Sequence, residues 1–270
     1  MLRFNILGPL EVLDGDRVVT PTPPKVRRVL ALLLLRANQV VPIDALIEEL
    51  WGEAPPPSAV TTTQTYIYQL RKALHGLPVT ESGGEWLLTK PPGYLMRFPA
   101  PQLDAHTFHA LSRHGRQLLE TGEPAEASVV LRRALDLWNG PSLANVTAGR
   151  LLEAQVVHLE EQRLRTLELR IQADAELGRH RELIGELRGL VRAYPLNEWF
   201  HGQLILALSR CGRRSEALQA YQDLRHVLNE QLGLDPQPEL QRLQREVLGC
   251  GVPQATVFGA HRRPALAGAM

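Results

Sequence analysis

The sequence predicts a mostly α-helical fold with a small β component, arranged as an α+β domain followed by an all-α domain. Two observations carry this prediction. Residues 1–98 mix short alternating strand patterns with three helical patterns, whereas residues 103–250 contain one helical pattern after another. Within that helical half, a glycine-led motif recurs after 34 residues, which is the period of tetratricopeptide arrays.

The composition excludes few classes by itself. A chain of 270 residues that is 44% hydrophobic is long enough for two ordinary domains. The formal net charge of +1 neither requires nor excludes a nucleic-acid partner. Cys211 and Cys250 form no CxxC pair, so we expect idle thiols in a reducing cytoplasm. The longest apolar run, residues 29–35, is far shorter than the roughly 20 residues that span a bilayer, so we expect no membrane association.

The α+β domain begins with strands and continues with helices. Residues 2–13 predict an extended chain, and the turn after them predicts a returning strand. Pro24 and Pro42 each open a helix with apolar residues at helical spacing, and a proline-rich break ends the second helix. Residues 60–74 predict a third helix, because an apolar stripe runs along one side of them.

A hairpin closes the first domain. Residues 86–89 and 94–98 predict two short strands. Between them, Pro92 and Gly93 fit the second and third positions of a type II turn. Three helices followed by a hairpin indicate a winged helix-turn-helix. In that fold the third helix enters the major groove of DNA, and the hairpin tip contacts the neighbouring backbone or minor groove.

The second domain is predicted to contain stacked helical hairpins. The expected helices are 104–120, 124–138, 150–177, 181–193, 199–210, 215–231 and 237–248. Segments that start at Gly178 and Gly212 align in register, and a third, shifted copy starts at Gly122. A tetratricopeptide-like array is therefore expected; chance similarity between amphipathic helices is the alternative. The expected domains are 1–98, 99–250 and a disordered tail or linker at 251–270.

The third helix separates two kinds of side chain. On a wheel of about 100° per residue, Val60, Ile67, Leu70 and Leu74 form the expected buried stripe. The opposite side carries Thr61, Thr62, Thr65, Gln69 and Lys72, with Tyr68 at its edge and Arg71 nearer the stripe. This face contains no acid, and its hydroxyl and amide groups suit base edges and phosphates in the major groove. The alternative is a partly buried helix whose threonines and tyrosines only pack.

The charge of the first domain limits what one module can bind. Residues 1–98 contain ten basic and nine acidic side chains. Because phosphate neutralisation dominates affinity for DNA, a single module should bind weakly. Two modules on adjacent sites would restore useful affinity.

Four segments of the chain resemble one known family. They are "LGPLEV", "KVRRVLALLLLRANQVVPIDALIEELWGEAPPPSAVTTTQTYIYQLRKAL", "LLTKPPGYLM" and "EALQAYQDLRHVLNEQLGLDPQPELQRLQREVL". They are similar to the antibiotic-pathway regulatory activators of filamentous actinobacteria, the SARP family, over residues 2–250. That family joins an OmpR-type winged helix to a bacterial transcriptional activation domain. The sequence starts directly at the first expected strand, so we expect no receiver-type segment with a phosphoacceptor.

The resemblance implies a cytoplasmic, nucleoid-associated transcriptional activator of secondary-metabolite genes. It would bind direct repeats in double-stranded promoter DNA as a side-by-side homodimer. It would recruit RNA polymerase holoenzyme through the sigma factor and the alpha or beta subunits. Carried over by position, the DNA contacts fall on Thr61, Thr62, Thr65, Tyr68, Gln69, Arg71 and Lys72, with Thr89 and Lys90 in the wing; a solvated turn lysine is the alternative for Lys90. The polymerase contacts fall on Glu53, Ala54, Pro55, Pro56 and Pro57.

Catalytic and metal motifs are missing from the sequence. It contains no P-loop, no GxSxG and no HExxH motif. His106, His109 and His114 lie near Asp104 without a nearby cysteine, so we expect solvated histidines and no metal site. We therefore expect no cofactor and no enzymatic activity. Two alternatives stay open: a protein-interaction adaptor that works through its helical array, and the front piece of a larger ATP-dependent regulator.

Overall fold

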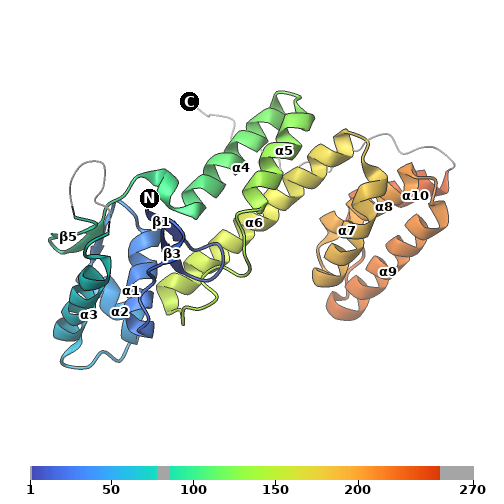
Figure 1. The fold of residues 1–270 in the computed structure, drawn as a ribbon. Helices are drawn as coiled ribbons and strands as arrows, with labels where there is room; N and C mark the ends of the chain where they lie inside the picture. The colour runs from blue at the N-terminus through green and yellow to red at the C-terminus, as the bar shows by residue number, and fades with distance from the viewer. Residues whose placement is uncertain (1, 78–84, 250–270) are drawn as a thin grey trace, which may run out of the picture. The chain divides into compact units, whose positions relative to one another are not determined.

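The computed structural model describes residues 2–77 and 85–249 (Figure 1). The chain divides into two compact units, Met1–Arg170 and Ile171–Met270. The division falls inside helix α6 (Arg150–Glu176). Cys250 and the expected tail at 251–270 lie outside the described residues.

The N-terminal strands form an antiparallel sheet of their own. Strands β1 (Leu2–Asn5), β2 (Glu11–Asp14) and β3 (Arg17–Val18) pair in that order. Phe4 pairs with Val12, and both side chains are buried, as the alternation of a half-buried strand requires. The predicted strands and the returning strand are confirmed.

The winged helix is built from three helices and a second sheet. Helices α1 (Pro24–Leu35), α2 (Ile43–Trp51) and α3 (Ala59–Leu74) are followed by the hairpin of β5 (Leu87–Lys90) and β6 (Gly93–Met96). Strand β4 (Val40–Pro42) pairs with β6, so the sheet order is β4-β6-β5. The helices and the hairpin were predicted, but β4 was not. Three residues between two helices are too few to show a strand period.

The hairpin turn differs from the predicted one. Lys90 pairs with Gly93, so the loop consists of Pro91 and Pro92, and the peptide bond between them is cis. A type II turn centred on Pro92 and Gly93 is therefore wrong, because Gly93 belongs to strand β6 and lacks the positive φ of that turn. Glycine is needed at position 93 for a different reason. A Cβ there would lie 1.9 Å from the carbonyl oxygen of Val41.

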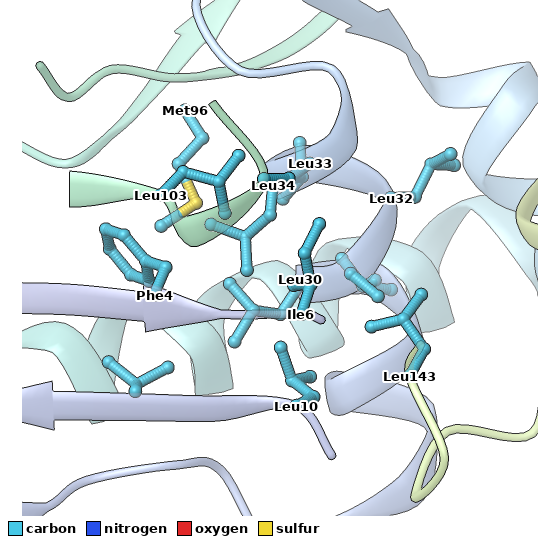
Figure 2. Close-up of a cluster of buried hydrophobic side chains, with 14 of the residues drawn as sticks. Phe4, Ile6, Leu10, Leu30, Leu32, Leu33, Leu34, Met96, Leu103 and Leu143 are labelled. Atoms are coloured by element: carbon cyan, nitrogen blue, oxygen red, sulfur yellow. The ribbon is translucent and has the colours of Figure 1, made fainter. Parts of the chain in front are cut away.

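One hydrophobic core runs through the first unit. Figure 2 shows this core; its labelled side chains are Phe4, Ile6, Leu10, Leu30, Leu32, Leu33, Leu34, Met96, Leu103 and Leu143. It continues through Phe108 and Leu152 to Leu159. Residues from the N-terminal sheet, the winged helix and helices α4 (Asp104–Glu120) and α6 are thus buried together. Burying this apolar area is the main stabilising contribution to the unit.

All seven predicted helices of the second half are confirmed. Besides α4 and α6 they are α5 (Pro124–Leu135), α7 (His180–Ala193), α8 (Glu198–Arg210), α9 (Arg214–Leu232) and α10 (Pro238–Leu248), and a short 3-10 helix, η1 (Ala100–Gln102), precedes α4. Gly122, Gly178 and Gly212 have φ values of +80°, +75° and +74°, which suit the glycine that follows a helix C-terminus. The aligned residues Leu187 and Tyr221 are both buried, as the tetratricopeptide-like alignment predicts.

Asp104 connects the start of α4 to the chain that follows β1. Its carboxylate accepts hydrogen bonds from the backbone N–H groups of Ile6 at 2.8 Å, Leu7 at 2.9 Å and Ala105 at 2.7 Å. Burial raises the pKa of Asp104 to about 6, and the three N–H donors offset only part of that effect.

A pH-dependent stability is expected from Asp104. Because the folded pKa lies above the unfolded value, the folded state binds the proton more tightly. The free energy of unfolding should therefore fall as pH rises from about 4 to about 7, by up to about 3 kcal/mol. Urea denaturation at several pH values measures this fall. In Asp104→Asn the fall should be smaller by that amount; an unchanged pH profile would contradict the assignment.

Candidate DNA-binding surface

Helix α3 presents a buried stripe that is shifted from the predicted one. Val60 is 47% exposed, whereas Thr63 is fully buried beside Ile67. The predicted burial of Val60 is wrong for two physical reasons. Val60 lies in the first turn, about 60° from the centre of the stripe at 100° per residue. The hydroxyl of Thr63 donates to the carbonyl of Ala59 at 2.8 Å, so it can be buried without an unsatisfied donor.

The exposed side of α3 carries most of the predicted contact residues. Exposed are Thr61, Thr65, Tyr68, Gln69 and Lys72, whereas Thr62 and Arg71 are half-buried. No residue of α3 is acidic, and its last turn carries Arg71 and Lys72. A phosphate backbone would therefore meet hydroxyl, amide and ammonium groups on this side and no carboxylate.

Sequence reasoning missed two exposed residues of the same helix, Val60 and Gln64. A signal for them was present. Thr63 lies four residues before Ile67 and seven before Leu70, which is the spacing of one helix face. If Thr63 is included in the buried stripe, the centre of the stripe moves away from Val60 and Gln64, and both residues are then expected to be exposed.

Arg71 braces α3 against the hairpin. Its Nη2 donates to Thr89 Oγ1 at 2.7 Å, and its Nε and Nη2 lie 3.4 Å from the carbonyl oxygen of Leu87. The guanidinium also lies 5.9 Å from the centre of the Tyr94 ring. The structure thus brings Arg71 and Thr89 together, with most of the guanidinium engaged by the protein. Lys90 is exposed at the end of β5, next to the hairpin loop.

The loop between α2 and α3 is exposed and anchored at its base. Glu53, Ala54, Pro55 and Pro57 are exposed, and Pro56 is half-buried. At the end of α2, Lys25 Nζ donates to the carbonyl oxygen of Leu50 at 2.7 Å, and Arg28 Nη1 donates to that of Glu49 at 3.2 Å. Cations at a helix C-terminus satisfy its last carbonyls and interact favourably with its dipole.

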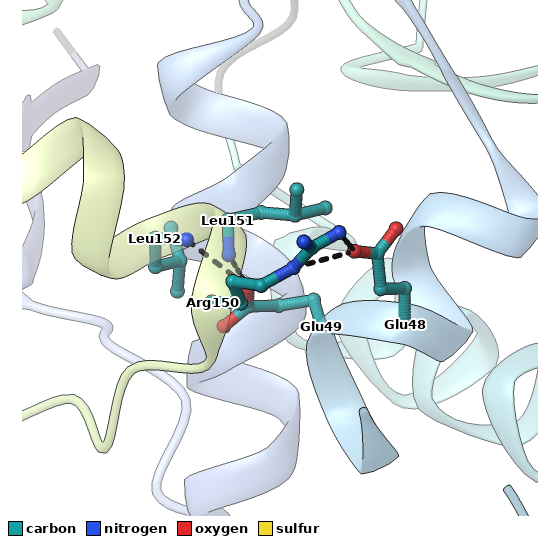
Figure 3. A network of polar contacts seen from close by, with 5 residues as sticks. All are labelled: Glu48, Glu49, Arg150, Leu151 and Leu152. Carbon is teal, nitrogen blue, oxygen red and sulfur yellow. Dashed lines mark hydrogen bonds and ion pairs between the residues drawn. The ribbon is translucent and has the colours of Figure 1, made fainter. Parts of the chain in front are cut away.

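The same end of α2 is joined to the start of α6 (Figure 3). The Glu49 side chain is buried, and its carboxylate accepts from the backbone N–H groups of Gly149 at 2.5 Å and of Leu151 and Leu152 at 3.0 Å. Glu48 forms an ion pair with Arg150. Glu49 therefore supplies the N-terminal cap of α6 from about 100 positions away. No local pattern in the sequence indicates this contact.

The prediction that the three histidines of α4 are solvated is only partly correct. His114 is exposed, but His106 and His109 are half-buried rather than solvated. Burial, followed by the nearby His106, lowers the pKa of His109. Within residues 2–77 and 85–249, no group of three or more histidine, cysteine or carboxylate side chains is arranged to hold a metal ion. In the same residues, no helix is both long and apolar enough to cross a membrane.

Two family models together match most of the chain. Residues 17–94 match "Transcriptional regulatory protein, C terminal", and residues 103–248 match "Bacterial transcriptional activator domain". The first match covers the three helices and most of the hairpin, and the second covers α4 to α10.

Individual relatives show the same arrangement. The regulatory protein DnrI of Streptomyces peucetius is 42% identical over 92% of both chains. The regulatory protein AfsR of Streptomyces coelicolor is 41% identical over 92% of this chain but only 24% of its own length. The solved structure titled "Mycobacterium tuberculosis EmbR in complex with low affinity phosphopeptide" is 33% identical, with a TM-score of 0.86 over 93% of this chain and 65% of that chain. The predicted fold class, a winged helix followed by an all-α domain, is confirmed.

Proposed function

The chain belongs to the SARP family of transcriptional regulators, which are not enzymes, and from this membership we propose how it acts. It binds direct repeats in double-stranded promoter DNA as a side-by-side homodimer and recruits RNA polymerase at genes of secondary metabolism. Residues 1–98 form the DNA-binding domain and residues 99–250 the activation domain, within the cytoplasm at the nucleoid. The observation that carries the proposal is the acid-free exposed side of α3.

The DNA contacts follow from the exposure of the side chains. Thr61, Thr65, Tyr68, Gln69 and Lys72 face solvent on α3, so they enter the major groove without repacking the helix. Thr62, Arg71, Thr89 and Lys90 complete the proposed contact set. The first two are half-buried, and Arg71 already bonds Thr89. Arg71 therefore acts mainly by holding the hairpin at a fixed place beside α3.

The charge of the DNA-binding domain favours the binding of two copies. Residues 1–98 carry only one more basic than acidic side chain, so one domain neutralises few phosphates. When the two copies are joined as a dimer, the second copy binds the adjacent repeat without losing its translational entropy again, so its contacts add to the affinity. This reasoning supports the side-by-side homodimer.

The polymerase contact is placed on Glu53, Ala54, Pro55, Pro56 and Pro57. Four of these five residues are exposed. The base of the loop is held by Lys25 and Arg28. Three prolines and an anchored base leave little conformational entropy to lose on docking. The sigma factor and the alpha or beta subunits are the proposed partners.

The proposal is tested by selecting bound sequences from random duplexes and measuring affinity by gel shift. Gln69→Glu changes only an amide to a carboxylate, and Lys72→Glu reverses a charge on the same side of α3. We expect each to weaken binding to the selected tandem site by about a hundredfold, because each adds a carboxylate that repels phosphate in both copies.

Matched controls separate charge from location. Gln117→Glu on α4 makes the same amide-to-carboxylate change, and Arg192→Glu on α7 makes the same reversal of charge, each at another exposed position. Both variants should bind like the unaltered protein. Affinity that does not fall with rising salt would favour the interaction adaptor instead. Undiminished binding by both α3 variants would overturn the placement of the contact surface.

A further inference from the structure

The hydroxyl group of Thr65 is already engaged within α3. Its Oγ1 donates to the carbonyl oxygen of Thr61 at 3.0 Å, although the side chain is exposed. A threonine hydroxyl has one proton to donate. Without breaking this bond, Thr65 can offer a ligand its γ-methyl and the lone pairs of Oγ1, but no hydrogen-bond donor. The hydrogen bond also restricts the side chain to one arrangement.

Thr61 differs from Thr65 although both are exposed on the same helix face. They lie one turn apart, and neighbours four residues apart share a face. Among the residues that the structure describes, the Thr61 hydroxyl has no hydrogen-bond partner, while its backbone carbonyl accepts from Thr65. The Thr61 hydroxyl is therefore free to donate to a phosphate oxygen. Two identical residues thus differ in chemistry: Thr61 has a free hydroxyl proton to donate, whereas Thr65 has none and presents its γ-methyl beside an acceptor oxygen.

We infer that Thr65 recognises a thymine in the major groove through a contact between its γ-methyl and the C5-methyl of the base. Thymine is the base that presents a methyl group in that groove. The inference rests on the proposed function, in which α3 enters the major groove. It deepens that function by assigning one base of each repeat. Thr61 then contributes affinity that is independent of sequence, because it contacts a phosphate.

Exchanges between threonine, valine and serine test the assignment. Thr65→Val keeps the methyl and should bind the selected site like the unaltered protein. Thr65→Ser keeps the hydroxyl but loses the methyl, and should bind about fourfold more weakly per repeat, from the burial of one methyl group. At position 61 the order reverses: Thr61→Ser should bind normally and Thr61→Val weakly. The two positions serve as controls for each other on one helix.

Replacing thymine by deoxyuridine, one base at a time, removes only the C5-methyl group. One such replacement in each repeat should weaken binding by the unaltered protein and by Thr65→Val about fourfold per repeat. The same replacement should leave Thr65→Ser unaffected, because the methyl contact is already missing. Circular dichroism checks that the variants keep their helix content.

The outcomes separate this inference from the proposed function. If DNA binds but Thr65→Val weakens it while Thr65→Ser does not, the hydroxyl is the recognising group and the inference is overturned. Insensitivity to deoxyuridine at every thymine overturns it as well, and the proposed function stands in both cases. If random duplexes yield no bound sequence, the proposed function and the inference fail together.

Discussion

Replacing Glu49 with alanine should lower the free energy of unfolding of the first unit by about 1.5–3 kcal/mol, the range for losing hydrogen bonds to a charged group. The carboxylate caps α6 by accepting from Gly149, Leu151 and Leu152. Alanine leaves these N–H groups without their acceptor and removes a negative charge from a helix N-terminus. Chemical denaturation followed by tryptophan fluorescence measures the loss, since Trp51, Trp86 and Trp138 all lie in this unit.

Glu48 provides the control at the neighbouring position. Its carboxylate pairs with Arg150, whose side chain is 82% exposed, and exposed ion pairs contribute about 0–1 kcal/mol. Glu48→Ala should therefore change stability by less than about 1 kcal/mol. Glu49→Gln, which retains one acceptor oxygen, should fall between the two alanine variants. Equal losses in Glu48→Ala and Glu49→Ala would contradict the capping role.

Replacing Gly93 with alanine should destabilise the first unit by about 3 kcal/mol or more, at the upper end of overpacking effects. The added Cβ would lie 1.9 Å from the carbonyl oxygen of Val41 and 2.8 Å from Cα of Pro42. Both atoms belong to the backbone of β4, so no side-chain rotation relieves the overlap. Strand β4 must separate from β6, and the pairing of Val41 with Tyr94 is then lost. Denaturant titration measures the stability, and hydrogen exchange of the β4 and β6 amides locates the change.

Gly185 on α7 tests whether the effect is specific to this position. A Cβ at Gly185 meets no atom within 4 Å. Gly185→Ala should therefore be neutral or stabilise its helix by about 0.5–1 kcal/mol. If Gly93→Ala is as stable as the unaltered protein, the close approach of β4 and β6 is not a constraint on the wing.

The helices were predictable because their signals are local. Most have an apolar period and end near a glycine or proline, and the structure places α4 at the predicted limits. The family resemblance added the order of the domains and is confirmed by the matches over residues 17–94 and 103–248. The individual DNA and polymerase contacts stay predictions.

The errors arose where distant residues decide the local structure. The sequence suggests a turn role for Gly93. In the structure, the backbone of β4, some 50 residues earlier in the chain, leaves no room for a side chain at this position. Thr63 reads as polar, yet a hydrogen bond within the helix lets it enter the core. Glu49 and Asp104 each bond backbone groups about 100 positions away. Such partners are brought together by tertiary packing, and one sequence without aligned homologues carries no signal for them.

The continuous core of the first unit bears on how such regulators can recombine. Phe4 and Leu30 of the N-terminal part share that core with Phe108 and Leu152 of α4 and α6. An exchange between relatives at residue 98 would not pass through a linker. It would combine core side chains from two different proteins in one close-packed interior, and such interiors tolerate changes in side-chain volume poorly. New DNA specificities are therefore more easily acquired by substitutions on the surface of α3 than by exchange of the whole winged helix.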